Sequence, residues 1–264
     1  MNHEDQECSR PAHLPDVQSI RFAQESAPAP TRLSGIDAME EFRPRDVLGR
    51  DNRQPSPNLR QPPWRLICHL VMTDAQGREF AGTGWLAGPS TVLTAAHNLY
   101  SSAHGYAAAS VTVIPGRDGN TAPWGSLTST SFATLDLWRQ TSRAEVDIGV
   151  IWLPQALGQS LGYFGFQALD DAVLLHHAVY TAGYPEDRPW GTQWYDQSTI
   201  HRVDANLIAY GLDTIPGQSG SPVFALDAAG NPVAVGVHAY GNLRENLGVR
   251  ITRPMFQILT GWWR

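Results

Sequence analysis

The most informative stretch of the sequence is Gly217-Gln218-Ser219-Gly220-Ser221-Pro222, which lies between the strand-like apolar runs 199–210 and 222–226. Glycines on both sides of Ser219 allow a sharp turn that exposes the serine hydroxyl and brings neighbouring N–H groups toward one point. Such a turn suits a nucleophile, although a Gly-rich turn that contains serines is more often only a turn. A catalytic interpretation therefore requires a base and an acid elsewhere in the chain.

His97 and Asp147 are the candidates for that base and acid. His97 ends the strand-like run 92–96, which is a rigid position for a general base. Asp147 precedes the apolar run 148–153, and a carboxylate beside apolar residues is costly unless an N–H group, such as that of an imidazole, binds it. Glu145 lies further from the run and is the alternative acid. The alternative, non-catalytic interpretations are that His97 is only a histidine at a strand end and that Asp147 is only an aspartate in a turn.

The remainder of the chain from Trp64 onward favours an all-β fold. Short apolar runs alternate with Gly, Pro, Asn and Asp, many of them at intervals of roughly 8–12 residues, as in sandwiches and barrels. The end of the chain is different, because a capping Thr252, a Pro254 in the first turn and a one-sided apolar stripe predict a helix over 253–263. The predicted strand runs are 64–72, 80–87, 91–95, 110–114, 146–153, 173–182, 199–210, 222–226, 233–239 and 247–251.

Composition excludes several classes of protein. The chain has 264 residues, a formal net charge of −6, 42% hydrophobic and 17% charged residues, which together predict one large or two small folded domains. All nineteen basic residues are Arg and no basic block stands out, so we expect no nucleic-acid partner. No apolar run approaches the roughly 18 residues of a membrane helix, so we expect no membrane association.

The first part of the chain differs from the rest. Residues 1–65 are richer in charge and in Pro than residues 66–264, and they lack sustained apolar periodicity, which predicts a flexible or peripheral segment with at most a short helix around 35–42. No signal peptide is evident at the start, and Cys8 and Cys68 form neither a disulfide framework nor a metal-ligand spacing. These features suit a cytoplasmic protein.

The order His97, Asp147, Ser219, with gaps of 50 and 72 residues, is that of the chymotrypsin-type proteases. Over about residues 47–264 the sequence resembles the trypsin-like superfamily, in particular the bacterial glutamyl endopeptidases. The further matching stretches are VLGRDNR at 47–53, PGRDGN at 115–120, LGYFGF at 161–166, AGYPEDRPWGTQW at 182–194 and DTIPGQSGSPVF at 213–224.

This resemblance implies two six-stranded antiparallel β-barrels, the first over about residues 64–155 and the second over about 165–251, followed by the C-terminal helix. It also implies a serine endopeptidase with a His97, Asp147 and Ser219 triad, and an oxyanion hole made by the N–H groups of Gly217 and Ser219. The expected partner is a polypeptide substrate, and the expected enzyme is a monomer without cofactor or metal. The competing classes are a non-catalytic protease homologue and an esterase.

The resemblance also implies a pocket for an acidic side chain before the scissile bond. The matching donors are His238 and Thr214, and the backbone from Ala239 to Gly241 would pair with the substrate. Asp213 is the competitor, because trypsin-like enzymes place an acid there to bind Arg or Lys. We favour acidic substrates, since residues 47–264 contain four Glu against fourteen Arg, a composition that limits self-cleavage by a Glu-specific enzyme.

The sequence departs from its relatives at three places. Gln218 stands where trypsin and chymotrypsin carry an aspartate that captures the new α-amine on activation. Gly82 and Asn98 stand where some family members have a disulfide. The family norm is secretion, which conflicts with the start of this chain, so its localisation stays open. Residues 1–46 are interpreted as a pro-segment removed near Val47, ahead of a protease domain over 47–264.

Overall fold

The computed structural model describes residue 47, residues 50–241 and residues 245–264. The chain divides into two units, residues 1–36 and 37–264, and all of the described residues belong to the second unit. The interpretation of residues 1–46 as a pro-segment, and the short helix expected around 35–42, lie outside the described residues. Within the described ranges, no helix is both long and apolar enough to cross a membrane.

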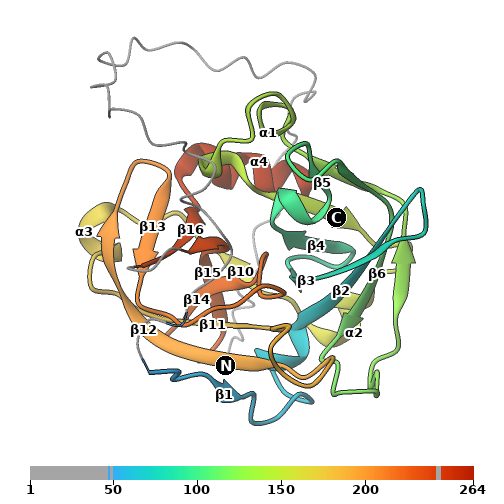
Figure 1. Cartoon of the computed structure of the whole chain (residues 1–264). Helices are drawn as coiled ribbons and strands as arrows, with labels where there is room; N and C mark the ends of the chain where they lie inside the picture. Colours follow the sequence, from blue (N-terminus) through green and yellow to red (C-terminus); the bar gives the residue numbers. More distant parts are fainter. Residues whose placement is uncertain (1–46, 48–49, 242–244) are drawn as a thin grey trace, which may run out of the picture. The chain divides into compact units, whose positions relative to one another are not determined.

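The first sheet forms a nearly closed barrel of antiparallel strands, on the right of Figure 1. Its strand order is β5-β6-β2-β3-β4-β9-β8, and β7 pairs with the outer side of β6. The strands are β2 (Ile67–Asp74), β3 (Glu79–Leu86), β4 (Thr91–Thr94), β5 (Tyr100–Ser101), β6 (Tyr106–Pro115), β7 (Leu127–Ser129), β8 (Phe132–Thr134) and β9 (Gly149–Trp152).

The second sheet is a closed barrel of six antiparallel strands, because β12 pairs with β13 as well as with β11. These six are β11 (Ala178–Gly183), β12 (Trp194–Val203), β13 (Leu207–Tyr210), β14 (Pro222–Leu226), β15 (Pro232–Gly241) and β16 (Asn246–Arg250). Two short strands join it from outside, β1 (Gln54–Pro55) on β12 and β10 (Gly165–Phe166) on β15.

Four helices occur in the described part of the chain, namely α1 (Asp136–Thr141), α2 (Leu157–Leu161), α3 (Asp171–Leu174) and α4 (Arg253–Trp262). Helix α4 confirms the predicted C-terminal helix. Thr252 caps it by accepting a hydrogen bond from the Met255 N–H at 3.3 Å, and Met255 and Leu259 are buried. The all-β fold with two barrels is likewise confirmed.

Three predicted strand runs differ in detail from the structure. Residues 171–174 form α3, so the strand expected over 173–182 begins only at Ala178. The run 199–210 is a hairpin of two strands, and 64–72 begins with a 3-10 turn over Trp64–Leu66. A short apolar run has the same pattern in a buried helical turn and in a buried strand, which is why the sequence did not separate them.

A chain of three aromatic rings connects the barrels. Trp85 of β3 meets Phe164 edge-on at 5.4 Å between ring centroids, and Phe164 meets Phe224 of β14 at 5.2 Å. Phe164 lies in the segment that joins the two barrels, and each ring is at most 1% exposed. Edge-to-face aromatic pairs add to the free energy of burial, so this chain is a substantial part of the contact between the barrels.

We predict that Phe164→Ala lowers the free energy of unfolding by about 3–5 kcal/mol, because it opens a cavity between both neighbouring rings. Urea denaturation of the two proteins measures this difference. The neighbouring Tyr163 is 42% exposed, so Tyr163→Ala is the matched control and should cost less than about 1 kcal/mol. Equal losses for the two variants would contradict the role of Phe164.

Candidate active site

Strand register brings His97 and Asp147 together. In the antiparallel pair β4 and β9, Thr94 lies opposite Gly149, so the residues just after β4 meet the residues just before β9. His97 lies in a 3-10 turn over Ala96–Asn98 that continues from β4, and Asp147 ends the turn before β9. Gly149 permits this approach, because a Cβ there would lie 2.7 Å from Leu99 Cδ1.

The two side chains form a tight pair. His97 Nδ1 lies 2.6 Å from Asp147 Oδ2, and the backbone N–H of His97 donates to Asp147 Oδ1 at 2.8 Å. Asp147 is fully buried, whereas the His97 side chain is 22% exposed. Because the carboxylate binds Nδ1, the Nε2 atom remains for proton exchange. Glu145, the alternative acid, instead pairs with Arg143 at 3.2 Å.

Tyr240 also contacts this carboxylate. Its side chain hydrogen-bonds Asp147, and its ring centroid lies 5.8 Å from that of His97. Burial, followed by the negative charge of Asp147, raises the pKa of Tyr240 far above its ordinary value, so the hydroxyl keeps its proton. Asp147 is therefore held by the main chain and ring of His97 and by Tyr240.

Ser219 lies in a loop whose glycines are required by the backbone. Gly217 and Gly220 have φ angles of 95° and 90°, which favour glycine. A Cβ at Gly220 would lie 2.1 Å from the Thr83 carbonyl oxygen, and a Cβ at Gly217 would lie 2.3 Å from that of Tyr184. Gly220 therefore fits against β3 of the first barrel, and Gly217 fits against Tyr184, which follows β11, only without a side chain.

Hydrogen bonds tie the Ser219 main chain to the turn that carries His97. The Ser219 carbonyl accepts from the Thr83 N–H at 3.0 Å and from Asn98 Nδ2 at 2.8 Å, and Asn98 follows His97 directly. Ser219 is 5% exposed, and among the described residues its hydroxyl makes no hydrogen bond of 3.5 Å or less. In unliganded enzymes such catalytic bonds are often long and tighten when substrate binds.

Two N–H groups in this loop are available to a ligand. The N–H groups of Gln218, Gly220 and Ser221 donate to carbonyls of Ile215, His238 and Gln218. Those of Gly217 and Ser219 have no acceptor in the described part of the chain. Both belong to the turn that carries the Ser219 hydroxyl, the arrangement that an oxyanion hole requires.

His238 borders the same loop. Its backbone N–H donates to the Ser221 carbonyl and its carbonyl accepts from the Gly220 N–H, each at 2.8 Å, while Nδ1 lies 2.8 Å from the Tyr210 hydroxyl. Burial, reinforced by the nearby His97, lowers the pKa of His238 to about 3. The ring is therefore neutral at neutral pH.

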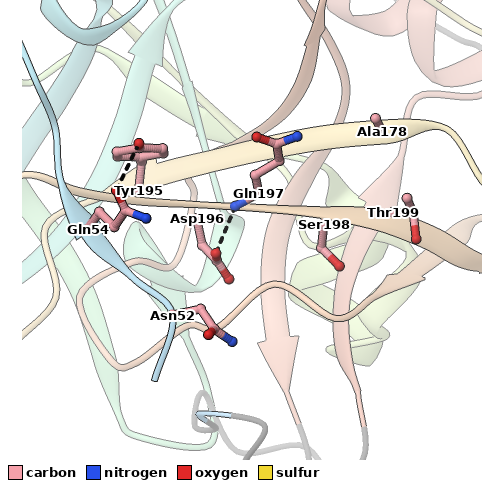
Figure 2. A pocket seen from close by; sticks show the side chains of 8 residues that line it. All are labelled: Asn52, Gln54, Ala178, Tyr195, Asp196, Gln197, Ser198 and Thr199. Atoms are coloured by element: carbon pink, nitrogen blue, oxygen red, sulfur yellow. Dashed lines mark hydrogen bonds between the residues drawn. The ribbon is translucent and has the colours of Figure 1, made fainter. Parts of the chain in front are cut away.

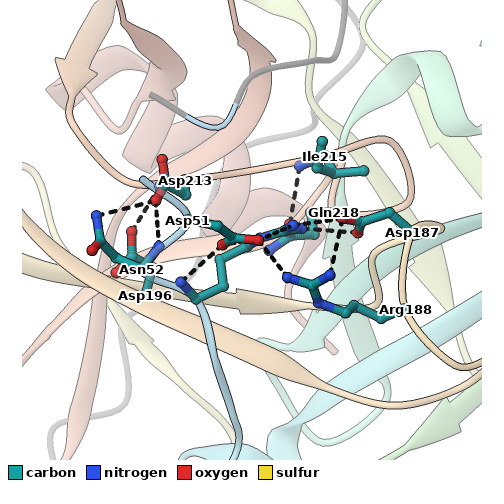
Figure 3. Close-up of polar contacts among 9 residues, drawn as sticks. Asp51, Asn52, Asp187, Arg188, Asp196, Asp213, Ile215 and Gln218 are labelled. Atoms are coloured by element: carbon teal, nitrogen blue, oxygen red, sulfur yellow. Dashed lines mark hydrogen bonds and ion pairs between the residues drawn. The ribbon is translucent and has the colours of Figure 1, made fainter. Parts of the chain in front are cut away.

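Asp213 and Thr214 are both buried, at 0% and 1% exposure. The Asp213 carboxylate accepts from the Asn52 N–H at 2.8 Å and from Asn52 Nδ2 at 3.3 Å, as Figure 3 shows. Its own N–H donates to Asp196 Oδ2 at 2.7 Å. The Asp213 carboxylate thus binds the segment near residue 52, which lies 161 positions away in the sequence.

Strand β15 presents a free edge next to Ser219. Its pairing with β14 ends at Val237 opposite Pro222, whereas its pairing with β16 continues to Gly241 opposite Asn246. Within the described residues, the edge of β15 at Ala239 and Gly241 therefore lies beyond the end of its pairing with β14. An extended peptide can add to such an edge.

A hollow lies elsewhere in the domain, away from His97 and Ser219. It measures about 570 Å³ and follows β12, where β1 pairs with only two residues and leaves the edge from Asp196 to Thr199 open (Figure 2). Its lining contains neither His97 nor Ser219, so we do not assign the chemistry to it. A second hollow of about 350 Å³ is closer to the Ser219 loop, since it is lined by Ala81 of β3 and by Glu186, whose Cγ would lie 3.1 Å from a Gly217 Cβ.

No group of three or more His, Cys, Asp or Glu that could hold a metal ion occurs in residues 47, 50–241 and 245–264. Cys68 is a buried free thiol, and its burial raises its pKa, which makes it a poor nucleophile.

Several contributors to the site were not predicted. Thr83, Asn98 and Tyr240 contact its members through hydrogen bonds, and Arg53 contacts the loop from a distant segment. The sequence analysis noted Asn98 only as the place of an absent disulfide. No local pattern marks a threonine or an arginine whose partner in the Ser219 loop lies more than 100 positions away, as is the case for Thr83 with Gly217 and for Arg53 with Gln218.

A family model described as a trypsin-like peptidase domain matches residues 82–235, which include His97, Asp147 and Ser219. The chain belongs to this family. The glutamyl endopeptidase of Bacillus licheniformis is 36% identical over 225 residues, which cover 83% of this chain and 69% of that protein. A Bacillus subtilis protein named extracellular metalloprotease is 29% identical over 225 residues, covering 85% and 72% of the two chains.

A solved structure of a Glu endopeptidase in complex with MPD is also similar. It has a TM-score of 0.73 and 29% identity, and the match covers 82% of this chain and 99% of that one. The chain is a trypsin-like serine peptidase close to the glutamyl endopeptidases, which confirms the resemblance and the enzyme class inferred from the sequence. A polypeptide substrate follows from membership of this peptidase family.

In this peptidase a Gly–Asn pair stands where some relatives have a disulfide. A Cβ on Gly82 would lie 2.7 Å from Asn98 Nδ2, so the Asn98 amide occupies the space beside Gly82. That amide donates to Thr94 Oγ1 at 2.9 Å as well as to the Ser219 carbonyl. The small Gly82 thus leaves room for an amide that binds the Ser219 loop.

We predict that Gly82→Ala destabilises the wild-type protein but has little effect in an Asn98→Ala background. The new methyl group must displace the Asn98 amide from both of its acceptors, and this conflict disappears when the amide is removed. Thermal unfolding of the four proteins in this double-mutant cycle should give a coupling of about 0.5–3 kcal/mol. Additive effects would show that the two residues do not share this space.

Proposed function

We propose that this peptidase hydrolyses peptide bonds preferentially after Glu or Asp, through Ser219, His97 and Asp147. The observation that carries the proposal is the turn Ala96–Asn98, which holds His97 on the Asp147 carboxylate while Asn98 holds the Ser219 carbonyl. One rigid turn thus connects the base to both its acid and its nucleophile.

In the proposed reaction, Ser219 Oγ attacks the carbonyl carbon of the scissile bond while His97 Nε2 takes the hydroxyl proton. The oxygen of the tetrahedral intermediate becomes an anion and is bound by the free N–H groups of Gly217 and Ser219. His97 then returns the proton to the departing amine. Water, activated by His97 in the same way, hydrolyses the acyl-enzyme. Asp147 holds His97 in the tautomer that carries its proton on Nδ1, and it stabilises the imidazolium that forms when Nε2 takes up a proton.

The preference for an acidic side chain rests on His238 and Thr214. A buried imidazole and a hydroxyl offer donors to a carboxylate without placing a fixed cation in the pocket, and a carboxylate beside His238 favours its protonated form. The competing basic preference needs the Asp213 carboxylate, which is bound by Asn52. The similar Bacillus licheniformis protein is named a glutamyl endopeptidase, which also supports the acidic preference.

Substrate would add as a strand to the free edge of β15 at Ala239 and Gly241, with its acidic side chain directed between His238 and Thr214. We retain residues 1–46 as a proposed pro-segment ahead of a protease domain over residues 47–264. An enzyme that keeps residues 1–46 and is as active as one trimmed to Val47 would overturn this assignment. The monomeric state remains a prediction.

We predict that the chain trimmed to Val47 cleaves a mixed peptide library after Glu and that Ser219→Ala abolishes these cuts, as mass spectrometry of the products will report. Asp147→Asn should lower kcat by about 10⁴, because the imidazole then adopts the wrong tautomer. Glu145→Gln is the matched control and should leave kcat within about twofold, since its exposed pair with Arg143 contributes little. Cuts that survive in Ser219→Ala would refute the proposed nucleophile.

We predict that kcat/KM is higher for a peptide with Glu than with Gln before the scissile bond, and that the ratio falls as the pH rises from about 6 to about 9. The free His238 ring is neutral at these pH values, so it must take up a proton when the Glu carboxylate binds beside it; this uptake becomes less favourable as the pH rises, whereas Gln requires none. Because His97 acts on both peptides, its titration cancels in the ratio. His238→Gln should make the ratio flat. Preferential cleavage after Lys or Arg would instead assign specificity to Asp213.

A further inference from the structure

The buried guanidinium of Arg53 contacts the Ser219 loop at Gln218. The Arg53 side chain is 0% exposed and binds two carboxylates, Asp51 through Nε and Nη2 at 3.0 and 2.9 Å, and Asp187 through Nη1 and Nη2 at 3.0 and 2.6 Å. Arg188 joins the cluster through Asp51. Two arginines and two aspartates make the cluster neutral, so Arg53 is charged without an excess of buried charge.

The arrangement keeps these charges in place. Hydrogen bonding to Arg53 lowers the pKa of Asp51 to about 2. Burial alone would lower the pKa of Arg53, but hydrogen bonds to Asp51 and Asp187 outweigh it and raise that pKa. The Arg53 guanidinium and the Asp51 carboxylate therefore stay ionised at neutral pH.

Arg53 also reaches the residue just before Ser219. Its Nη1 lies 3.4 Å from Gln218 Oε1, the same oxygen accepts from the Ile215 N–H at 3.0 Å, and the Gln218 N–H donates to the Ile215 carbonyl at 3.0 Å. Gln218 is fully buried. Its side chain and backbone thus close the loop on Ile215 and hold Gln218, whose following peptide unit carries the Ser219 N–H; the Gly217 N–H projects from the peptide unit between Pro216 and Gly217.

The second carboxylate partner connects Arg53 to the other wall of this loop. Asp187 follows Glu186, whose N–H donates to the Pro216 carbonyl at 2.8 Å, and Gly217 packs against the Tyr184 carbonyl. Arg53 therefore contacts one residue in each of the two segments, 184–187 and 215–218, which meet at Pro216 and Gly217.

We propose that Arg53 is a positioning residue for the oxyanion hole, acting through Gln218 and Asp187 rather than on the substrate. In trypsin and chymotrypsin an aspartate precedes the nucleophile and binds a cation, the α-amine released on activation. This chain carries the neutral Gln218 there, and the cation beside it is an internal side chain. The Gly217 and Ser219 N–H groups are then positioned without the α-amine that cleavage of the chain would release.

The test compares Arg53→Met, Gln218→Leu and the double variant with the wild type in the trimmed enzyme, with urea denaturation to establish folding. Arg250→Met is the matched control, because Arg250 is a similarly buried arginine, bound to Asp171 at 2.6 Å and to the Leu169 carbonyl at 2.8 Å, that contacts no residue of the Ser219 loop. Gln218→Glu keeps an acceptor for Arg53 and for the Ile215 N–H and serves as the conservative variant.

The readouts are kcat and KM on a Glu peptide amide, and the rate at which a phosphonate probe labels Ser219. For folded Arg53→Met and Gln218→Leu we expect kcat and labelling rate to fall about tenfold to hundredfold, short of the 10²–10³ for loss of a whole oxyanion donor, with KM within about threefold. In the double variant, kcat and the labelling rate should fall by much less than the product of the decreases in the two single variants. Gln218→Glu and Arg250→Met should keep kcat within about threefold.

Wild-type kcat and labelling in a folded Arg53→Met would overturn the inference. If Arg53→Met does not fold, Gln218→Leu decides, because it removes the same hydrogen bond and leaves the ion-pair cluster intact. The inference rests on the proposed role of Ser219, and the two can fail separately. Wild-type enzyme that cleaves without labelling at Ser219 refutes the proposed function, whereas Ser219 labelling that is unchanged in the variants refutes only the role of Arg53.

Discussion

The site depends on the contact between β3 of the first barrel and the Ser219 loop of the second. Thr83 supplies most of it, because its hydroxyl donates to the Gly217 carbonyl at 2.8 Å and its N–H donates to the Ser219 carbonyl. A buried polar group without a partner costs about 1–3 kcal/mol, so these bonds admit one relative position of loop and strand. The glycines of the loop then follow as a requirement, since a side chain at Gly220 would overlap the Thr83 carbonyl.

Buried ionisable groups set the second constraint. An unpaired charge in the interior costs several kcal/mol, and the chain meets this limit in two ways. His238 is neutral because burial lowers its pKa, whereas Arg53 stays charged because the carboxylates of Asp51 and Asp187 pair with it. Asn52 and Arg53 are adjacent in the sequence. Asn52 contacts Asp213 and Arg53 contacts Gln218, and both of these partners come more than 150 positions later. The segment before β1 is therefore part of the catalytic domain and not an extension of it.

Sequence patterns predicted the fold and the members of the site whose signals are local. Each of three signals can be recognised within about ten residues: a serine between glycines, a histidine after a buried strand and an aspartate before another strand. The antiparallel register of β4 and β9 then brings the histidine and the aspartate together. Helix α4 was predictable for the same reason, from one cap and one apolar stripe. Helix α3 was not, because four residues carry no period that separates a helical turn from a strand.

The meaning of Asp213 shows where local sequence is insufficient. An acid six residues before the nucleophile suggests a pocket for Arg or Lys, and nothing within the loop contradicts that suggestion. The group that binds this carboxylate is the backbone N–H of Asn52, 161 positions away, which any residue except proline would provide. A main-chain donor has no residue-type signature, so only the folded path of the segment around residue 52 shows that this carboxylate is bound within the domain.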